Sequence, residues 1–235
     1  MFKWTEDTVR FREDAALYNG MEKKLADELS RRIPKDASVC DLGCGLGFLG
    51  LELADLGYSV TAVDIDDLAL EVLEKNKRLR GLKDEQLQIV KADAFDISES
   101  TKWDVITMCF FGNTEESLRL LKKHCTGKGI IIKGYWEKRR FAGGDQRRNK
   151  VCTMDAAEEL SVAGIPFRVE KVSAETGQPF RSQKDADLFF EIYGGGRGER
   201  EFQPTGSADF PLFYSCPRDL GLLMIDAGNI PDSYI

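Results

Sequence analysis

The chain has 235 residues with 42% apolar content, and its 40 acidic and 33 basic side chains give a net charge of −7. This length and composition predict one soluble domain with a sizeable core, and the acidic balance argues against a nucleic-acid partner, which would need a basic face. No apolar run approaches the roughly 20 residues that span a bilayer and no signal-peptide pattern opens the chain, so we expect no membrane partner.

The first 37 residues are predicted to form two helices ahead of the main sheet. Thr5–Asn19 and Met21–Ile33 have helical patterns and are separated at Gly20. Aromatic side chains recur near the first helix every seven residues, which is close to two helical turns and predicts a common face. These aromatic residues are Trp4, Phe11 and Tyr18.

A glycine turn between a buried strand and a helix is the most informative segment. Val39–Leu42 has the pattern of a strand end, residues 43–47 form a turn with few side chains, and Phe48–Asp55 is helical. The glycines allow close approach to a ligand, and amides at the helix start can bind a carboxylate or a phosphate. Asp41 would repel a pyrophosphate but can pair with an ammonium group. We therefore expect a ligand that has both an amine and a carboxylate.

Three more strands are predicted to follow, and acidic residues stand near the ends of the first two. Tyr58–Ile65 contains Asp64, at the position where nucleotide-binding sheets hydrogen-bond ribose hydroxyls. Leu87–Lys91 is followed by Asp93, and Trp103–Phe110 is the fourth strand. Because ligands bind beyond the carboxyl ends of such strands, these residues are expected to gather at one site.

The order of these elements resembles the class I, Rossmann-like family of S-adenosylmethionine-dependent methyltransferases. The first motif of that family runs Asp-x-Gly-x-Gly-x-Gly, and residues 41–47 match it at all four fixed positions. The resemblance covers residues 36–136 well and the remainder as a topology. It implies an α/β fold with a mostly parallel sheet, an antiparallel last strand and helices on both faces.

The resemblance also implies the cofactor S-adenosyl-L-methionine, with S-adenosyl-L-homocysteine as the product. In this family an acid after the third strand contacts the adenine amino group and a neighbouring apolar side chain covers the ring. An N-terminal helical segment often serves as a lid, a role implied here for residues 1–37, with the catalytic domain over residues 38–235. Asp93 would contact the amino group, and Ala94 or Phe95 would cover the ring. The implied cofactor-binding residues are Asp41, Gly43, Cys44, Gly45, Gly47, Asp64, Ile65, Asp93, Ala94, Phe95 and Cys109.

The second half of the chain is predicted to complete the sheet. Loop or insert regions are expected over about 137–150 and 194–218. The last strand, Leu220–Asp226, would insert antiparallel beside the sixth strand in the resembled fold. The remaining helices are predicted over Asp66–Arg80, Glu115–Lys123, 153–163 and Gln183–Tyr193, and the fifth and sixth strands over Gly127–Tyr135 and 165–172.

Histidine and cysteine usage limits the chemistry of the site. A single histidine excludes a histidine-based zinc site, and no metal is expected. His124 is predicted to be a cationic cap at the end of a helix, where the helix dipole favours positive charge. The six cysteines form no CxxC pair and are typical of reduced thiols, so we expect a cytoplasmic location.

The methyl acceptor is predicted to be a small molecule that carries an anionic group. Glu137–Lys150 holds six basic against two acidic side chains and follows the fifth strand, so its start lies at the cofactor edge. Its arginines can bind a planar anion through paired hydrogen bonds, whereas a solvated loop without a role and an RNA contact are the alternatives. The candidate arginines are Arg139, Arg140, Arg147 and Arg148, and the candidate substrate-wall residues are Trp4, Tyr18, Phe111, Asn113, Tyr135 and Trp136.

Two other functions compete with methyl transfer. A nicotinamide-dependent oxidoreductase fits the relaxed GxGxxG pattern of the turn, but Asp41 and Asp93 count against it. A non-catalytic interaction module with a methyltransferase-like fold would not need the complete set of acids. The sequence identifies no general base, no accepting atom among nitrogen, oxygen, sulfur and carbon, and no oligomeric state.

Overall fold

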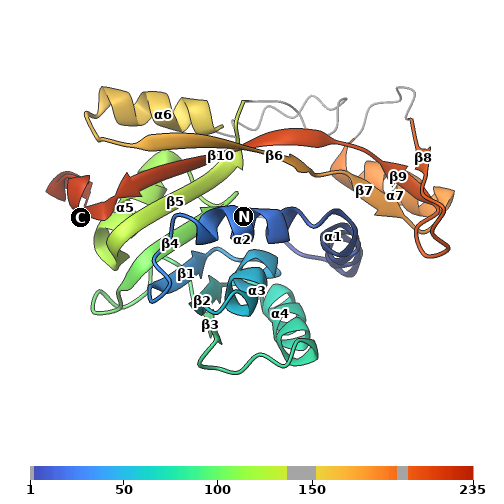
Figure 1. Cartoon of the computed structure of the whole chain (residues 1–235), viewed down its shortest axis with the longest axis horizontal. Coiled ribbons are helices and arrows are strands. Elements are labelled where there is room, and N and C mark those ends of the chain that lie inside the picture. Colours follow the sequence, from blue (N-terminus) through green and yellow to red (C-terminus); the bar gives the residue numbers. More distant parts are fainter. Residues whose placement is uncertain (1–2, 137–151, 195–200, 235) are drawn as a thin grey trace.

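The computed structural model describes residues 3–136, 152–194 and 201–234 of the chain. A seven-stranded sheet forms its centre, and a small three-stranded sheet lies at one end (Figure 1). The strands of the large sheet are β1 Ser38–Leu42, β2 Ser59–Asp64, β3 Leu87–Lys91, β4 Trp103–Cys109, β5 Cys125–Gly134, β6 Arg168–Glu175 and β10 Pro217–Asp226. The helices are α1 Glu6–Asn19, α2 Met21–Ser30, α3 Phe48–Asp55, α4 Asp67–Leu79, α5 Thr114–His124, α6 Thr153–Val162 and α7 Gln183–Tyr193, with short 3-10 turns η1 Ala227–Asn229 and η2 Asp232–Tyr234.

The large sheet has the strand order β3-β2-β1-β4-β5-β10-β6. The strands β1 to β5 run parallel, and β10 pairs antiparallel with both β5 and β6. This arrangement confirms the predicted Rossmann-like sheet, mostly parallel with an antiparallel last strand. From β1 the chain proceeds to β2 and β3 on one side and then returns to β4 and β5 on the other. The loops after β1 and β4 therefore diverge, and ligands of such sheets bind at this switch point, beyond the carboxyl ends of the strands.

Helices cover both faces of the large sheet and bury it in two apolar layers (Figure 1). α2, α3 and α4 pack on one face with fully buried side chains such as Leu25, Leu51 and Leu73. α5 and α6 pack on the other face with Leu121 and Leu160. Full burial of each leucine contributes about 1.5–3 kcal/mol, so these layers fix the sheet that carries the site. Within the described ranges, no helix combines the length and the apolar character needed to cross a membrane.

The chain between β6 and β10 forms a small aromatic unit at the end of the molecule where α1 also lies (Figure 1). Phe11 of α1 is buried in this unit and makes an edge-to-face contact with Phe189 of α7, with 5.1 Å between the ring centroids. Because β10 starts next to the end of β5, this aromatic unit stands at the carboxyl end of the parallel strands. The unit consists of α7 and the strands β7 Gln178–Phe180, β8 Gln203–Pro204 and β9 Leu212–Tyr214.

Ion pairs fix α1 to the aromatic unit. The buried carboxylate of Asp14 accepts two hydrogen bonds from the Arg181 guanidinium at 2.9 and 2.6 Å. Arg10 forms a second ion pair with Asp185 at 2.6 Å. A buried carboxylate is costly unless it is paired, so these contacts hold the body of α1 against α7 and β7.

The N-terminal elements differ in detail from the sequence prediction. α1 begins at Glu6, so Trp4 precedes the helix and does not share a helical face with Phe11. α2 ends at Ser30 instead of Ile33. The three strands of the small sheet were not predicted, because each has only two or three residues and none shows a hydrophobic alternation long enough to read.

The prediction that His124 is a cationic cap is wrong. The residue does end α5, but its side chain is fully buried and its Nδ1 lies 3.0 Å from the Thr101 carbonyl oxygen. Burial lowers the pKa of the imidazole, the hydrogen bond with Thr101 acts in the opposite direction, and the charge of Lys123 lowers the pKa further. The ring is therefore neutral at pH 7, with its Nδ1 proton donated to the carbonyl oxygen.

Candidate functional site

The glycine turn after β1 closes on the end of β2. Gly43, Gly45 and Gly47 have positive φ angles of 70°, 55° and 68°, a backbone region that favours glycine. The amides of Gly43 and Cys44 donate to the Val63 carbonyl oxygen at 2.9 and 3.0 Å. These hydrogen bonds hold the turn over β2, and α3 begins directly after it.

Asp64 connects the glycine turn to the start of α4. Its Oδ2 accepts the Gly45 amide at 2.7 Å, and its Oδ1 accepts the amides of Ile65 and Asp66 at 2.8 and 3.0 Å. The carboxylate thus lies between the turn and the end of β2. There it can also accept hydrogen bonds from two neighbouring hydroxyl groups of a ligand.

Asp41 lies beneath the turn and is buried, with 2% of its surface exposed. Burial raises its pKa to about 7, hydrogen bonds from Thr107 and the Gly50 amide act in the opposite direction, and the charge of Asp64 raises it further. The Thr107 hydroxyl donates to Oδ1 at 3.3 Å. Asp41 is therefore a buried carboxyl group that a nearby cation would stabilise in its ionised form.

The segment after β3 lies next to the end of β2. The Ala92 amide donates to the Asp64 carbonyl oxygen at 3.1 Å, and Asp93 Oδ1 accepts the Phe95 amide at 2.9 Å. The Phe95 side chain is exposed, as is Ile65 at the end of β2, whereas Ala94 is buried in the core. The structure thus brings the predicted residues from the ends of β2 and β3 together at one edge of the sheet.

The loop after β4 faces the glycine turn. Phe110 adopts φ 55° and is 51% exposed, and such strained backbone in a non-glycine residue is typical of functional sites. A Cβ atom built on Gly43 would lie 2.1 Å from Cδ2 of Phe111, so this ring packs directly on the turn. The Asn113 side chain caps α5 by accepting the Glu116 amide at 2.8 Å.

The two cysteines of the predicted site are neutral thiols. Burial raises the pKa of both Cys44 and Cys109, and the charge of Asp41 raises it further. A thiol with a raised pKa is a poor nucleophile, so both side chains act as small apolar groups at the ends of β1 and β4.

Two aromatic residues of the N-terminal segment lie in different places. The Trp4 indole covers the glycine turn, because a Cβ atom on Gly45 would lie 3.1 Å from its Cζ2. Tyr18 packs instead on Phe213 of the small sheet, with 4.9 Å between the ring centroids. Of these two substrate-wall candidates, the structure brings only Trp4 to the turn.

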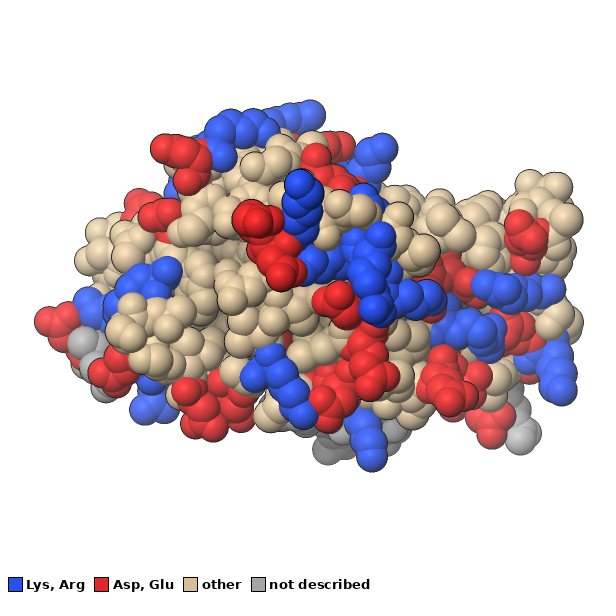
Figure 2. Space-filling view, turned by 90° about the horizontal axis from the view of Figure 1, so that it is seen from below, with Lys and Arg blue, Asp and Glu red and all other residues tan. Residues whose placement is uncertain are grey.

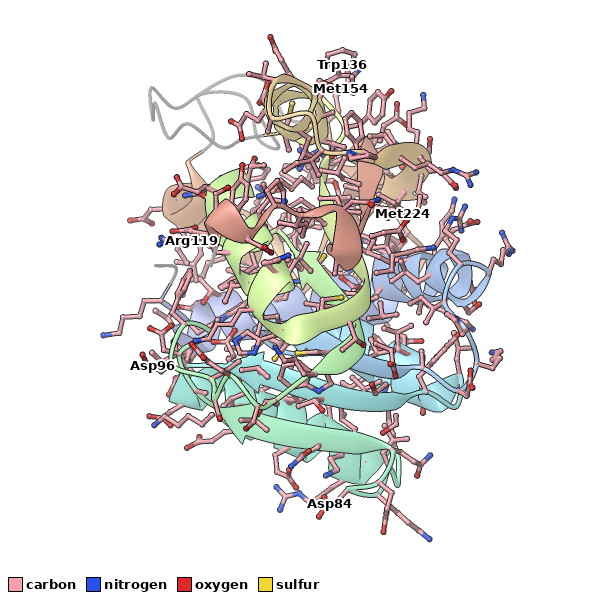
Figure 3. The ribbon with its side chains drawn as sticks, turned by 90° about the vertical axis from the view of Figure 1, so that its left-hand side faces the viewer. Asp84, Asp96, Arg119, Trp136, Met154 and Met224 are labelled. Carbon is pink, nitrogen blue, oxygen red and sulfur yellow. The ribbon has the colours of Figure 1, made fainter. Side chains whose placement is uncertain are left out.

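Tyr135 and Trp136 follow β5 and lie on the side of β10. The Tyr135 amide donates to the Asp219 carbonyl oxygen at 2.9 Å, and the two aromatic rings meet edge to face at 5.5 Å. The Met154 amide at the start of α6 donates to the Tyr135 carbonyl oxygen at 3.3 Å, and Figure 3 shows Trp136 and Met154 far from Asp96, which follows β3. These two candidates are therefore remote from the adenine side of the predicted site.

An ion pair beside the turn was not predicted. Arg12 of α1 binds the buried Glu22 of α2, and its guanidinium carbon lies 5.4 Å from the ring centroid of Phe48, the first residue of α3. The charges of both partners act on the thiol of Cys109 at the end of β4. The pair spans two helices separated at Gly20, a contact that no local pattern in the sequence indicates.

Lys133 of β5 is a second residue that the sequence did not indicate. Its side chain is buried, with its Nζ directed at the backbone of the loop after β4. In the sequence this lysine follows three isoleucines and precedes Gly134, so it resembles the polar end of an ordinary strand.

The predicted anion-binding arginines cannot be placed at the site. Arg139, Arg140, Arg147 and Arg148 lie outside the described residues. On the face that includes α4 and β3, acidic and basic side chains are interspersed (Figure 2), as in the ion pairs of Arg80 with Glu52 at 2.8 Å and of Lys91 with Asp67 at 2.5 Å. The described part of this face therefore differs from the basic face of a nucleic-acid binder.

Comparison with known proteins places the motif in a family. A family model described as a methyltransferase domain matches residues 33–184. The cypemycin N-terminal methyltransferase of a Streptomyces species is 36% identical over 120 residues, which are 47% of each chain. The mitochondrial ubiquinone biosynthesis O-methyltransferase of Schizosaccharomyces pombe is 36% identical over 69 residues, 29% of this chain and 25% of that protein. The chain thus spans about half or less of the length of these curated relatives.

Solved structures share the fold at low sequence identity. A TehB-like S-adenosylmethionine-dependent methyltransferase from Corynebacterium glutamicum aligns with a TM-score of 0.52 and 17% identity, over 93% of this chain and 94% of that one. The magnesium protoporphyrin IX methyltransferase of Synechocystis, solved with bound S-adenosylmethionine, aligns with a TM-score of 0.52 and 14% identity, over 95% and 86% of the two chains.

The family model covers more than half of the chain and includes the glycine turn and the ends of β2, β3 and β4. The sheet order and the structural neighbours agree with it. This assignment replaces the alternative of a nicotinamide-dependent oxidoreductase. The chain belongs to the class I, Rossmann-like family of S-adenosylmethionine-dependent methyltransferases.

Proposed function

We propose that this protein is an enzyme that transfers the methyl group of S-adenosylmethionine to a small anionic molecule. The observation that carries the proposal is the position of three features at neighbouring strand ends, namely the glycine turn after β1, Asp64 in β2 and Asp93 after β3. The missing Cβ atoms allow close approach, and the two carboxylates supply acceptors, so these residues fit the cofactor. A non-catalytic module would have no use for this combination.

The residues at the carboxyl ends of β1, β2 and β3 are each proposed to bind one group of the cofactor. Asp64 accepts the ribose hydroxyls and Asp93 the adenine amino group. Phe95 covers the adenine ring, because its side chain is exposed while Ala94 is buried. Asp41 acts from beneath the turn on the ammonium group, and the amides at the start of α3 bind the carboxylate.

Arg12 is proposed to bind the same carboxylate of the cofactor. It lies against Phe48 in the first turn of α3, and its ion pair with the buried Glu22 fixes the guanidinium there. A guanidinium has five N–H donors in a rigid fork, so it can hold Glu22 and a second carboxylate together.

The reaction requires mainly that the acceptor and the methyl group be aligned. S-adenosylmethionine supplies a methyl group that its sulfonium already activates. The protein orients the acceptor in line with that group and excludes water, which together can lower the barrier by several kcal/mol. α1 and the aromatic unit stand at the carboxyl end of the sheet, next to the turn, and they would limit the acceptor there to a small molecule. The arginines of Glu137–Lys150 would bind its anionic group.

The lid is proposed to be the segment that carries Trp4. Its indole covers Gly45, where the cofactor must approach, whereas the body of α1 is fixed by Asp14 and Arg181. We also propose a cytoplasmic location, which is supported by six free cysteines.

Asp64→Ala should weaken the binding of S-adenosylhomocysteine by about 1.5–3 kcal/mol, because hydrogen bonds to a charged acceptor are lost. Asp67→Ala is the matched control, since this exposed acid of the first turn of α4 forms an ion pair with Lys91 on the surface. Titration calorimetry on both variants measures the difference. Unchanged affinity in Asp64→Ala, with the control also unchanged, would remove Asp64 from the site.

Asp41 should make the stability of the protein depend on pH. Burial raises its pKa from 3.8 to about 7 in the folded protein, so the unfolded chain loses this proton at lower pH than the folded chain does. The free energy of unfolding should therefore fall as the pH rises from about 4 to about 7, by a total on the order of 4 kcal/mol. In urea unfolding, Asp41→Asn should remove this contribution, and an unaltered pH profile would contradict the burial argument.

The affinity for the cofactor should change with pH in the opposite direction. An ammonium group next to Asp41 favours the ionised carboxylate, so S-adenosylhomocysteine should bind about tenfold more tightly at pH 8 than at pH 6. Calorimetry at both pH values measures this, and Asp41→Asn should bind weakly and without the dependence. Equal affinity of the wild-type protein at both values would show that Asp41 does not pair with the ammonium group.

Trp4 should report cofactor binding by its fluorescence. S-adenosylhomocysteine at the turn must alter the surroundings of the indole on Gly45, so the emission should change on titration. Trp4→Phe should abolish the change, whereas Trp136→Phe should retain it because Trp136 lies beyond β5. A change that persists in Trp4→Phe would place the lid elsewhere. Deleting residues 1–19 is the less direct test, since it would also uncover the aromatic unit around Phe189.

The acceptor should be found in the anionic part of a metabolite extract. Fractions from anion exchange, incubated with the protein and S-adenosylmethionine, should yield S-adenosylhomocysteine and one methylated product. Replacing the loop arginines singly by glutamine should raise the KM of that acceptor and leave the affinity for the cofactor unchanged. Arg12→Gln should instead lower the affinity for the cofactor. Arg119→Gln, on the exposed side of α5, is the control. Turnover only in neutral fractions would contradict the anionic acceptor. The loop arginines are Arg139, Arg140, Arg147 and Arg148.

A further inference from the structure

Lys133 is a buried lysine that lies under the loop after β4. Its side chain is 6% exposed, on the face of β5 that packs against α5 and α6. Its Nζ donates to the carbonyl oxygens of Phe111 and Gly112, at 3.4 and 2.5 Å. Burial lowers the pKa of the ammonium group, and the charges of Glu116 and Glu159 act in the opposite direction. The lysine therefore holds two consecutive peptide groups of one loop.

The loop that Lys133 holds has an unusual backbone. Phe110 and Gly112 both have positive φ, at 55° and 61°, on either side of Phe111. The Phe110 amide still donates to the Ile132 carbonyl oxygen at 2.8 Å, so the chain leaves the sheet abruptly at this point. A left-handed phenylalanine is strained and persists only where surrounding contacts fix it. The two hydrogen bonds from Lys133 are such contacts.

The same loop presses a side chain on the cofactor turn. The Phe111 ring occupies the space that a Cβ atom on Gly43 would need, because such an atom would lie 2.1 Å from Cδ2 of the ring. The backbone of Phe111 is held by Lys133 on one side and its ring by the glycine turn on the other. Movement of the loop would therefore withdraw the ring from the turn.

We propose that Lys133 is a positioning residue for the cofactor site: it holds the Phe111 and Gly112 carbonyl groups so that the Phe111 ring stays on Gly43 and keeps the turn in its binding shape. Packing alone does not require a lysine at this position. An apolar side chain between α5 and α6 would avoid the free energy needed to bury an ammonium group. The inference concerns the cofactor and is independent of the acceptor.

The test is a double-substitution cycle with S-adenosylhomocysteine as the probe. Lys133→Met removes the donors and keeps most of the length of the side chain, and Phe111→Ala removes the ring. We expect Lys133→Met to weaken binding about tenfold, or about 1.4 kcal/mol. In the Phe111→Ala background the same change should weaken it less than about twofold, because coupled residues are not additive. Ile131→Val, on the same face of β5, is the control and should bind as the wild type does.

Hydrogen exchange of the loop amides gives an independent measurement. The amides of residues 111–113 should exchange faster in Lys133→Met than in the wild-type protein. Their exchange rates should be unchanged in Ile131→Val. Lys133→Arg, which keeps the charge and the donors, should recover most of the affinity. Lys133→Leu, which also removes the donors, replaces the Met variant if that variant does not fold.

Two results would overturn the proposal. One is a tenfold loss of affinity from Lys133→Met in both backgrounds, which would mean that the lysine acts without Phe111. The other is wild-type affinity and wild-type loop exchange in Lys133→Met. If the wild-type protein did not bind S-adenosylhomocysteine at all, the cofactor assignment itself would fail, which is a separate outcome.

Discussion

Three missing Cβ atoms determine how the parts of this site meet. Each glycine of the turn has a left-handed backbone, and each faces a side chain from a different part of the chain, so both space and conformation require glycine. The loop after β4, the segment before α1 and the helix α4 therefore converge on the turn, and a change in one of them alters the surface that the others present to a ligand. A built Cβ atom would lie 2.1 Å from Phe111 at Gly43, 2.5 Å from Leu73 at Gly47 and 3.1 Å from Trp4 at Gly45.

The features that lower stability gather around this turn. Asp41 is buried with a raised pKa, Lys133 is buried beneath the loop after β4, and Phe110 has a strained backbone. Each would be replaced by an apolar residue or a glycine if stability were the only requirement. The apolar layers under α2, α3, α5 and α6 contain few such features and offset them. The presence of these three unfavourable groups together at the carboxyl edge agrees with a site that is shaped for a charged ligand.

Local patterns predicted most of the fold, and long-range contacts account for what they missed. The bounds of α3, β3 and α7 agree with the prediction, because hydrophobic periodicity and turn residues act within a single element. The aromatic unit between β6 and β10 depends on strands too short to show a period. Arg12 and Glu22 pair across two helices, and nothing within either helix predicts that contact. For His124, the position at a helix end was predicted from local sequence. Its charge was not, because that depends on burial against Thr101 and Trp103, which are distant in the sequence.

The position of Trp4 outside α1 decides which part of the N-terminal segment can act as a lid. Moving the whole helix would leave the buried Asp14 carboxylate without its Arg181 partner and would also withdraw the fully buried Phe11 from the aromatic unit, and both changes are unfavourable. Moving only the residues before the helix would expose part of one indole, which costs about 1–2 kcal/mol at the usual value per unit of apolar area. Thr5 separates the two parts, because its side chain caps α1 by accepting the Thr8 amide at 3.3 Å. We therefore expect opening of the site to occur ahead of Thr5, with α1 remaining on the aromatic unit as a fixed wall.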